Sequence, residues 1–511
     1  MQKREERKKK WLFLVFHRRA MVALMILAQI AFLALAITAW ARRPGVALGM
    51  WGFTVVVIVY VLLRHGERAA FLPWIVLCLA FPIFGGLFYF AFHLGASSPA
   101  LRRAVRGIEE SLLLPAASSS LSEAAAMHPK NARLMRYLSS SEKFPVYGGR
   151  VAYLPSGEDF LASLAEALSK AEKYIFLEYF IVEEGVMWEH IYEILRRKAA
   201  EGVLIRVMYD DVGCLLRLPS DFPKRLRADG MECAVFNPFR PMLSGLQNNR
   251  DHRKIAVIDG EIAFTGGANL ADEYINEIHP FGHWKDAAVR IEGEAARAFA
   301  AIFLQNWCLC LGREEPLAPF IPQASSPVDS ESLVQPYADS PLDANAVGEG
   351  VYLAAIASAE KRLYITTPYF IVGDNILKAL VAAAKSGVDV RIVTPRIWDK
   401  RLVHAVTRSY YPALIAGGVR VYEYAEGFIH SKTLTADGNL SIVGTTNFDY
   451  RSLYYHFECG AVIYGEKVAS ALESDFSEIL ARSREITAGE CKKGVIGRFI
   501  AELLRIFAPM M

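Results

Sequence analysis

One pattern of polar residues occurs twice in this chain and limits how the chain can fold. The stretch HRKIAVIDG, His252–Gly260, matches HSKTLTADG, His430–Gly438, with histidine, lysine, aspartate and glycine at the same spacing. The two histidines are 430 − 252 = 178 residues apart, and a glycine and an asparagine at 266 and 269 recur at the same offset, at 444 and 447. Two copies of one polar set predict two similar halves that together build one site.

The segments around each copy also follow a common order of strand, helix and strand. YIFLEYFIV (174–182) and LYITTPYFIV (363–372) have the pattern of buried strands, and each precedes a helical stretch and a second strand. The second strands, GVLIRVMYD and GVDVRIVTP, share Gly-Val and an arginine at matching positions. Because strand–helix–strand units form sheets covered by helices, we expect an α/β fold. It should consist of two duplicated halves, residues 150–312 and 350–490, with mixed, largely parallel sheets.

Two further segments lack this pattern and are predicted to be linkers. Residues 313–349 are rich in Pro, Ser, Ala and Asp, which is typical of a connection between domains. Residues 99–149 separate the apolar N-terminal region from the first half and are expected to form a juxtamembrane linker. With 511 residues, the chain is too long for one ordinary domain, so two packed units with additional segments are expected.

The first hundred residues are more apolar than the rest of the chain. After a basic N-terminus, apolar runs cover about 20–41, 46–63 and 69–94, and about 20 apolar residues suffice to cross a bilayer. We therefore expect transmembrane helices within residues 1–98 and a multi-pass protein of the cell (inner or plasma) membrane. A signal peptide is the alternative for the first run, which exceeds the roughly 7–15 apolar residues of such peptides. Basic residues flank several runs, so the side that the remaining chain faces stays open.

The C-terminal residues 491–511 also carry an apolar pattern. Val495, Phe499, Ile500 and Leu503 recur at helical spacing, with lysine and arginine nearby. This pattern predicts an amphipathic helix that lies on the bilayer surface. A terminal helix packed on its own domain fits the same pattern equally well.

Charge and cysteine content narrow the classes of function. The formal net charge is only +3, and no stripe of alternating basic and aromatic residues occurs, so a nucleic-acid partner is not expected. The seven cysteines are scattered and show neither a disulfide framework nor a zinc pattern. We expect a site that uses no metal and no other cofactor.

The paired histidines and lysines suit a phosphodiester substrate. In a strand, residues i and i+2 face the same way, so His252 shares a face with Lys254, and His430 with Lys432. One neutral imidazole can attack phosphorus, while the other, protonated, gives its proton to the leaving oxygen. The lysines and two asparagines are expected to bind the phosphate oxygens and stabilise their charge. These asparagines are Asn269 and Asn447.

The aspartates of the repeated pattern stand in dipeptides that are typical of turns. Asp259-Gly260 and Asp437-Gly438 have the form of turns that start a hairpin. Asp259 and Asp437 complete the predicted catalytic motif, but turn formation is enough to explain them. We therefore expect their role to be mainly structural.

These features resemble the two HKD motifs of the phospholipase D superfamily and, over nearly the whole chain, its bacterial cardiolipin synthase family. Residues 248–274, NNRDHRKIAVIDGEIAFTGGANLADEY, are similar to the first motif region of that family. Residues 427–458, GFIHSKTLTADGNLSIVGTTNFDYRSLYYHFE, are similar to the second. The departures are Asp251 and His456 in place of asparagine, Lys285 in place of arginine, and Thr445 and Thr446 in place of serine and alanine.

The resemblance implies a role for each histidine. His252 would be the nucleophile and His430 the general acid, although the near-symmetry of the two motifs leaves that order open. Each histidine needs a carboxylate that sets its tautomer. We expect Asp286 to orient His252 and Glu458 to orient His430. The alternative of two surface carboxylates is weakened by their apolar neighbours.

The resemblance also implies a reaction. A phosphatidyl group would pass from one phosphatidylglycerol to another through a phosphohistidine, giving cardiolipin and glycerol, so both lipids are the expected partners. Hydrolysis of phospholipids, or transfer to a different alcohol, would use the same chemistry. A membrane-tethered nuclease is a further alternative, which the near-neutral charge disfavours. The sequence predicts no oligomeric state.

Overall fold

The computed structural model describes residues 44–63, 71–81, 84–93, 99–117, 120–240, 245–321, 332–343, 345–492 and 494–510, and before these the positions 27, 30, 31 and 34. The chain divides into two compact units. One comprises Met1–Ser98 with Phe239–Asn248, and the other comprises Pro99–Pro238 with Asn249–Met511. Both copies of the repeated motif lie in the second unit.

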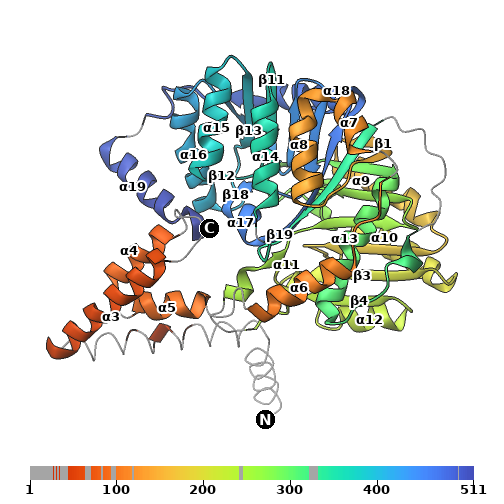
Figure 1. Cartoon of the computed structure of the whole chain (residues 1–511), viewed down its shortest axis with the longest axis horizontal. Helices are drawn as coiled ribbons and strands as arrows, with labels where there is room; N and C mark the ends of the chain where they lie inside the picture. The colour runs from red at the N-terminus through yellow and green to blue at the C-terminus, as the bar shows by residue number, and fades with distance from the viewer. Residues whose placement is uncertain are drawn as a thin grey trace, which may run out of the picture. The chain divides into compact units, whose positions relative to one another are not determined.

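A single large sheet runs through the second unit and joins the two halves (Figure 1). Its centre is β1 (Tyr147–Leu154) beside β10 (Ser332–Asp339), and a matching series of strands extends outward from each. From β1 the order is β9 (Ala288–Gly293), β7 (Ile262–Gly266), β6 (Lys254–Ile258), β2 (Tyr174–Tyr179), β3 (Leu204–Asp210) and β4 (Glu232–Phe236). From β10 it is β19 (His456–Tyr464), β17 (Leu440–Gly444), β16 (Thr433–Ala436), β11 (Arg362–Thr366), β13 (Asp389–Pro395), β14 (Arg420–Tyr424) and β20 (Ser483–Glu485).

Along this main strand order, parallel pairing occurs only in the outer part of each half. β2, β3 and β4 run parallel, as do β11, β13 and β14, whereas the other neighbours in this strand order pair antiparallel. The expectation of largely parallel sheets is therefore wrong for the inner strands. The reason lies in the two Asp-Gly turns, where φ is 56° at Asp259 and 53° at Asp437. Such turns join adjacent strands as hairpins, here β6 to β7 and β16 to β17, and hairpins are antiparallel.

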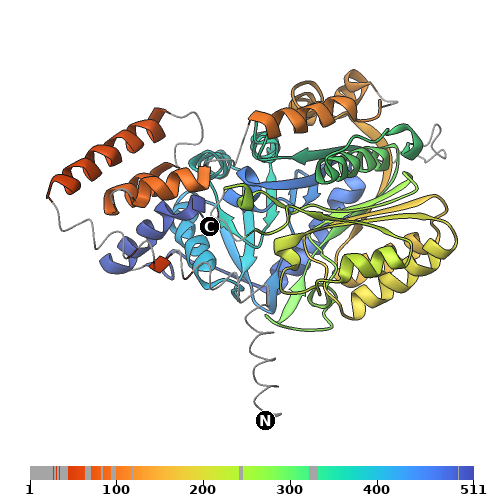
Figure 2. The ribbon, with the colours of Figure 1, turned by 90° about the horizontal axis from the view of Figure 1, so that it is seen from below.

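Helices cover both faces of this sheet (Figure 2). In β2, Phe176 packs on one face against α13 (Glu294–Leu311), with its ring 4.6 Å from that of Phe303. Ile175 and Leu177 belong to the core on the opposite face, with α9 (Gly157–Ser169) and α10 (Val186–Ala200). This alternation is the pattern of a strand buried on both faces. In the second half, α14 (Val347–Ser358), α15 (Asp374–Lys385) and α16 (Arg401–Ala416) cover one face and α18 (Glu466–Ala481) covers the other.

Both segments predicted as linkers contain helices or strands in their described parts. Residues 313–349 contain β10, which is buried throughout and pairs with β1 on one side and β19 on the other. The polar residues of β10 suggested a linker, but in the fold they form hydrogen bonds with buried groups. Gln335, for example, accepts a hydrogen bond from the hydroxyl of Tyr464 at 2.5 Å. The segment 99–149 contains α6 (Pro99–Ser111), α7 (Leu121–Met127), η2 (Pro129–Asn131), α8 (Ala132–Arg136) and η3 (Tyr137–Ser141).

The first unit contains apolar helices, α3 (Pro44–Leu63), α4 (Leu72–Ala80) and α5 (Phe84–His93), and the short η4 (Gly245–Asn248). The run 69–94, predicted as one transmembrane helix, is therefore two helices of 9 and 10 residues. Pro82 lies between them and lacks the amide hydrogen that a continuous helix would use. Within the described ranges, no helix combines the length and the apolar character needed to cross a bilayer. The run 20–41 lies almost entirely outside the described residues, so the predicted transmembrane segments are not confirmed.

The C-terminal segment folds as α19 (Val495–Ile506). Its Leu504 packs against the core of the second half, and the guanidinium of Arg505 lies 4.6 Å from the ring centre of Tyr410. The apolar side chains of Phe499 and Ile500 remain 66% and 50% exposed. One side of the helix thus contacts the domain, and another presents apolar groups to the surroundings.

Candidate active site

Around the histidines, short strands of the first half pair with strands of the second half. The first of these pairings anchors His252. β5 (Arg250–Asp251), just before His252, pairs in parallel with His456 and Phe457 at the start of β19 in the other half. The amide of His252 then donates to the carbonyl oxygen of Phe457 at 2.9 Å. The first motif is therefore fixed to the strand that carries Glu458.

A second strand pairing between the halves anchors His430. β8 (His283–Lys285) pairs with β15 (Gly427–Ile429), which precedes His430, and the amide of His430 donates to the carbonyl oxygen of Lys285 at 2.7 Å. Position 427 requires glycine, because a Cβ there would lie 2.1 Å from the carbonyl oxygen of His283. The second motif is therefore fixed to the strand that leads to Asp286.

Each histidine consequently receives its carboxylate from the opposite half. Nδ1 of His252 lies 2.9 Å from Oε1 of Glu458, and Nδ1 of His430 lies 2.7 Å from Oδ2 of Asp286. The expected pairing of Asp286 with His252 and of Glu458 with His430 is therefore wrong. That expectation assumed that each half supplies the carboxylate for its own histidine. The strand pairings between the halves instead place each histidine beside the carboxylate of the other half. The tautomer with hydrogen on Nδ1 allows each ring to donate to its carboxylate, and the lone pair of that tautomer is on Nε2.

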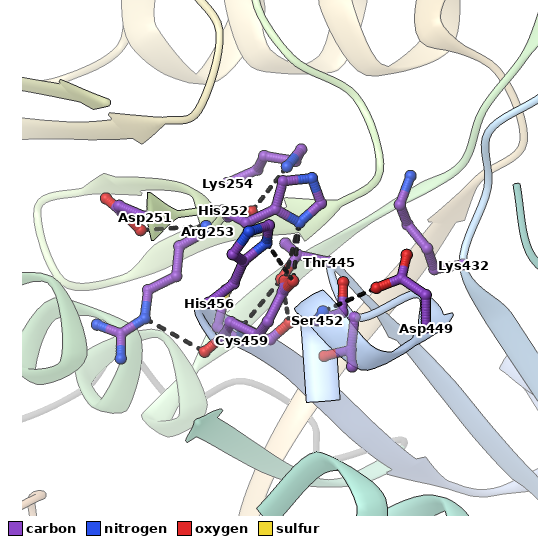
Figure 3. Close-up of polar contacts among 12 residues, drawn as sticks. Asp251, His252, Arg253, Lys254, Lys432, Thr445, Asp449, Ser452, His456 and Cys459 are labelled. Carbon is purple, nitrogen blue, oxygen red and sulfur yellow. Dashed lines mark hydrogen bonds and ion pairs between the residues drawn. The ribbon is translucent and has the colours of Figure 1, made fainter. Parts of the chain in front are cut away.

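Both carboxylates are fully buried, and each accepts a further hydrogen bond from a group other than its histidine. The hydroxyl of Thr445 donates to Oε2 of Glu458, and the oxygen of that hydroxyl accepts from the amide of Cys459 at 3.0 Å (Figure 3). Oδ1 of Asp286 accepts from the amide of Ala287 at 2.9 Å. The same oxygen faces Gly267, where a Cβ would lie only 1.9 Å away. Threonine at 445 thus supplies the hydroxyl that the serine usual in the family would supply.

Burial favours the neutral form of both imidazoles. It lowers the pKa of His430 to about 4, Lys432 adds to the shift, and Asp286 opposes it. The pKa of His252 is lowered well below its ordinary value, mainly by burial and then by Lys254. Both rings therefore have an available lone pair at neutral pH.

The surroundings shift the pKa values of the two carboxylic acids in opposite directions. Burial acts to raise the pKa of Asp286, but the charges of His430 and Lys432 and several hydrogen bonds outweigh it, so the pKa falls below its usual value. Burial raises the pKa of Glu458 well above its usual value. The carboxylate beside His430 is therefore the better partner for a protonated imidazole.

The two motif lysines bring positive charge to the site. The ammonium of Lys254 donates to the carbonyl oxygen of His252 at 2.7 Å, and that of Lys432 lies 3.1 Å from Nε2 of His430. Burial lowers the pKa of Lys254 to about 8 and that of Lys432 to about 7. A bound phosphodiester would favour the charged form of both, so the lysines suit an anionic substrate.

The two asparagines that follow the motifs are partly used by the protein itself. Oδ1 of Asn269 accepts from the amide of Ile181 at 3.0 Å, and its Nδ2 donates to the hydroxyl of Tyr274 at 2.6 Å. Oδ1 of Asn447 has no hydrogen-bond partner among the described residues. Phosphate binding by these amides stays a prediction.

Asp259 and Asp437 serve the fold rather than the chemistry. The carboxylate of Asp259 accepts from the amides of residues 172, 173 and 174 at 2.7–2.8 Å, where β2 begins. That of Asp437 accepts from the amides of residues 360, 361 and 362 at 2.8–3.0 Å, where β11 begins. Neither aspartate contacts a motif histidine, so their place in the predicted catalytic set is corrected to a structural one, as turn formation suggested.

Two departures from the family have local partners. The ammonium of Lys285 lies 2.7 Å from Oδ1 of Asp475, which ties the first half to α18 of the second. Oδ1 of Asp251 accepts from the amide of Arg253 at 3.1 Å. In the described part of the chain, neither side chain is hydrogen-bonded to a motif histidine.

His456 is the residue near the site to which sequence reasoning assigned no role. Its ring centre lies 5.6 Å from that of His252, and neither of its ring nitrogens has a hydrogen-bond partner among the described residues (Figure 3). The signal was present in the sequence, because residues 456 and 458 of one strand must share a face. Within the described ranges, His252, His456 and Glu458 form the group whose ligand atoms lie close enough together to hold a metal ion.

Comparison with known proteins places this site in a family. The family described as "Cardiolipin synthase, PLD-like domain" matches residues 164–307 and 352–480, and so covers both motifs. A cardiolipin synthase of Geobacillus kaustophilus is 34% identical over 500 residues, which cover 96% of this chain and 99% of that protein. Cardiolipin synthase 2 of Bacillus anthracis is 39% identical over 362 residues, or 70% of each chain.

A solved structure supports the fold independently. The phosphatidylserine synthase of Haemophilus influenzae Rd KW20 superposes with a TM-score of 0.56 at 16% identity, covering 74% of this chain and 98% of that one. At this identity the likeness concerns the fold alone. The match of both halves to one family, and the cover of nearly the whole chain by a relative, show that the chain belongs to the cardiolipin synthase family of the phospholipase D superfamily.

Proposed function

We propose that this protein is a phosphatidyltransferase that makes cardiolipin by transferring the phosphatidyl group of one phosphatidylglycerol to a second and releasing glycerol. The observation that carries the proposal is the pair of buried histidines from two halves, each with a carboxylate at Nδ1. Such a pair can hold one phosphoryl group between a nucleophile and an acid. The substrate is proposed from the cardiolipin synthases to which the chain is similar.

The environment of each histidine supports one order of roles. His252 is strongly biased to the neutral form, so its Nε2 lone pair is available for attack on phosphorus. His430 lies beside the charged carboxylate of Asp286, which favours its protonated form once an anionic phosphate is also present. We therefore assign His252 as the nucleophile and His430 as the general acid.

Two displacements then complete the reaction. Nε2 of His252 forms a bond to phosphorus, the bond from phosphorus to the glycerol oxygen breaks, and that oxygen takes the proton of His430. A hydroxyl of the second phosphatidylglycerol next loses its proton to His430 and attacks phosphorus, and the bond to His252 breaks. The lysines compensate the charge of the phosphoryl oxygens in both steps.

Transfer, rather than hydrolysis, requires that water be kept from the phosphohistidine. Both motif histidines are only 7% exposed, so the protein leaves little room for water around them. If water did attack, the product would be phosphatidic acid. The ratio of cardiolipin to phosphatidic acid therefore reports how well the site excludes water.

The test is a lipid product assay with the purified full-length chain. Phosphatidylglycerol vesicles are incubated with the protein and a chelator, and the lipids and free glycerol are measured by mass spectrometry. Equal amounts of cardiolipin and glycerol are expected. Phosphatidic acid as the main product would indicate a hydrolase, and an unchanged lipid would exclude phosphatidylglycerol as the substrate.

We further propose that the protein works at the cell membrane, with α19 on the lipid surface. The support is the apolar side of that helix, which leaves Val495, Ile496 and Phe499 66–76% exposed, with basic residues that suit anionic lipids. Phe499→Ser in mixed micelles should raise the mole fraction of phosphatidylglycerol needed for half-maximal rate several-fold and leave kcat unchanged. Val186→Ser, at a 54% exposed apolar residue on α10, is the matched control. Equal behaviour of the two variants would contradict a lipid contact by α19.

A further inference from the structure

The ring nitrogens of His456 are shielded from solvent and have unused hydrogen-bonding capacity. Its side chain is 11% exposed, and both ring nitrogens are shielded and lack a hydrogen-bond partner among the described residues. Buried polar groups in native proteins nearly always have a partner, so two unused nitrogens on one ring point to a ligand. The ring lies beside that of His252, at 5.6 Å between centres (Figure 3).

The surroundings of His456 indicate the chemical class of that ligand. One ligand atom each from His252, His456 and Glu458 lies within 4.8 Å of the others. Oε1 of Glu458 is 2.9 Å from Nδ1 of His252 and 3.8 Å from Nδ1 of His456. Two imidazole nitrogens and one carboxylate oxygen are a set that zinc uses with an open fourth position, at bonds of about 2.0–2.2 Å.

We propose that His252, His456 and Glu458 form an inhibitory binding site for zinc or a similar first-row transition-metal ion. The backbone supports the set, because His456 and Glu458 lie on one face of β19, and the amide of His252 is bonded to the residue between them. The ammonium of Lys254 is directed at the carbonyl oxygen of His252 and so is engaged outside this ligand set.

The metal would act on the tautomer of the nucleophile. In the free site, the tautomer with hydrogen on Nδ1 of His252 can donate to Glu458, and its lone pair is on Nε2. A metal ion on Nδ1 replaces that hydrogen bond, and the proton of the neutral ring moves to Nε2. The lone pair that attacks phosphorus is then lost, so the ion stops the reaction without blocking the approach of lipid. This effect on activity rests on the proposed function, whereas metal binding itself does not.

Binding is tested first, with cobalt(II) as the probe. The full-length chain in detergent is titrated with Co²⁺, and the visible absorption of low-coordinate, nitrogen-ligated cobalt is recorded. Wild type should bind one equivalent. His456→Asn, which introduces the residue usual in the family, should weaken binding by at least about 10–100-fold, since even an outer-shell partner contributes that much. His190→Asn, at an exposed histidine of α10, is the matched control and should bind as wild type does.

Inhibition is tested second, with zinc in the lipid assay. Zn²⁺ should inhibit wild type, a chelator should restore the rate, and His456→Asn should keep its basal rate and resist zinc. Absence of the cobalt spectrum, or the same spectrum from His456→Asn, would overturn the proposal. Loss of basal activity in His456→Asn, with a raised KM for phosphatidylglycerol, would instead make His456 a lipid contact and also overturn it. If no lipid product forms at all, the cobalt titration still decides whether the metal site exists.

Discussion

Replacing either motif histidine with alanine is expected to stop cardiolipin formation, but at different steps. His252→Ala removes the atom that bonds to phosphorus, so no covalent intermediate can form. His430→Ala leaves that atom in place and removes the proton donor, which should slow the release of glycerol by about 10²–10⁴-fold. The rates are measured as cardiolipin formed from phosphatidylglycerol.

A substrate whose leaving group needs no proton separates the two variants. The phosphatidyl ester of 4-nitrophenol releases a stable anion, so His430→Ala should give a burst of one equivalent of nitrophenolate and then stall. His252→Ala should give no burst, and the exposed control His190→Ala should behave as wild type does. A burst from His252→Ala and none from His430→Ala would assign the two roles the other way round.

The crossed carboxylates are expected to have equally large effects. Glu458→Gln and Asp286→Asn keep the size of each side chain, but an amide can hold its histidine in the wrong tautomer, at a cost of up to about 10⁴-fold in kcat as in catalytic triads. Because Glu458 is bonded to His252, its variant should share the defect of His252→Ala. Because Asp286 is bonded to His430, its variant should share the defect of His430→Ala.

The nitrophenyl ester distinguishes crossed from uncrossed pairing. Asp286→Asn should recover the burst with this ester, and Glu458→Gln should not. Glu423→Gln provides the matched control, since Glu423 is a buried carboxylate on β14 that is bonded to Tyr411 and to neither motif histidine. Recovery by Glu458→Gln in place of Asp286→Asn would mean that each half supplies its own carboxylate in solution.

Much of the fold could be predicted from short sequence patterns. The duplicated motif predicts two halves, and the apolar runs around it predict the strands that became β2, β3, β11 and β13, because burial on both faces leaves a strong sequence signal. The Asp-Gly dipeptides also predict the two hairpins. Hairpins require antiparallel pairing in the middle of the sheet, which the expectation of largely parallel sheets did not include. β10 was missed because its polar side chains bond to buried partners, and composition cannot distinguish such a strand from a linker.

In the site, too, the sequence predicts features within one strand but not contacts between the two halves. The paired histidines and lysines could be found from spacing, since residues two apart in a strand share a face. The partners of the histidines could not, because β5 and β8 are strands of two and three residues whose pairing with the other half leaves no periodic signal. His456 differs from the residue usual in the family, which the sequence shows, but its position beside His252 and Glu458 is seen only in the structure.

In the proposed reaction, His252 carries the phosphatidyl group between two lipid molecules. The most direct measurement is the peptide mass spectrum of the protein after reaction with phosphatidylglycerol and an alkaline quench, which preserves phosphohistidine. We expect a phosphatidyl adduct on the peptide that contains His252. The adduct should be absent in His252→Ala and enriched in His430→Ala supplied with the nitrophenyl ester. An adduct on the peptide that contains His430, or sustained transfer with no adduct on either, would contradict it.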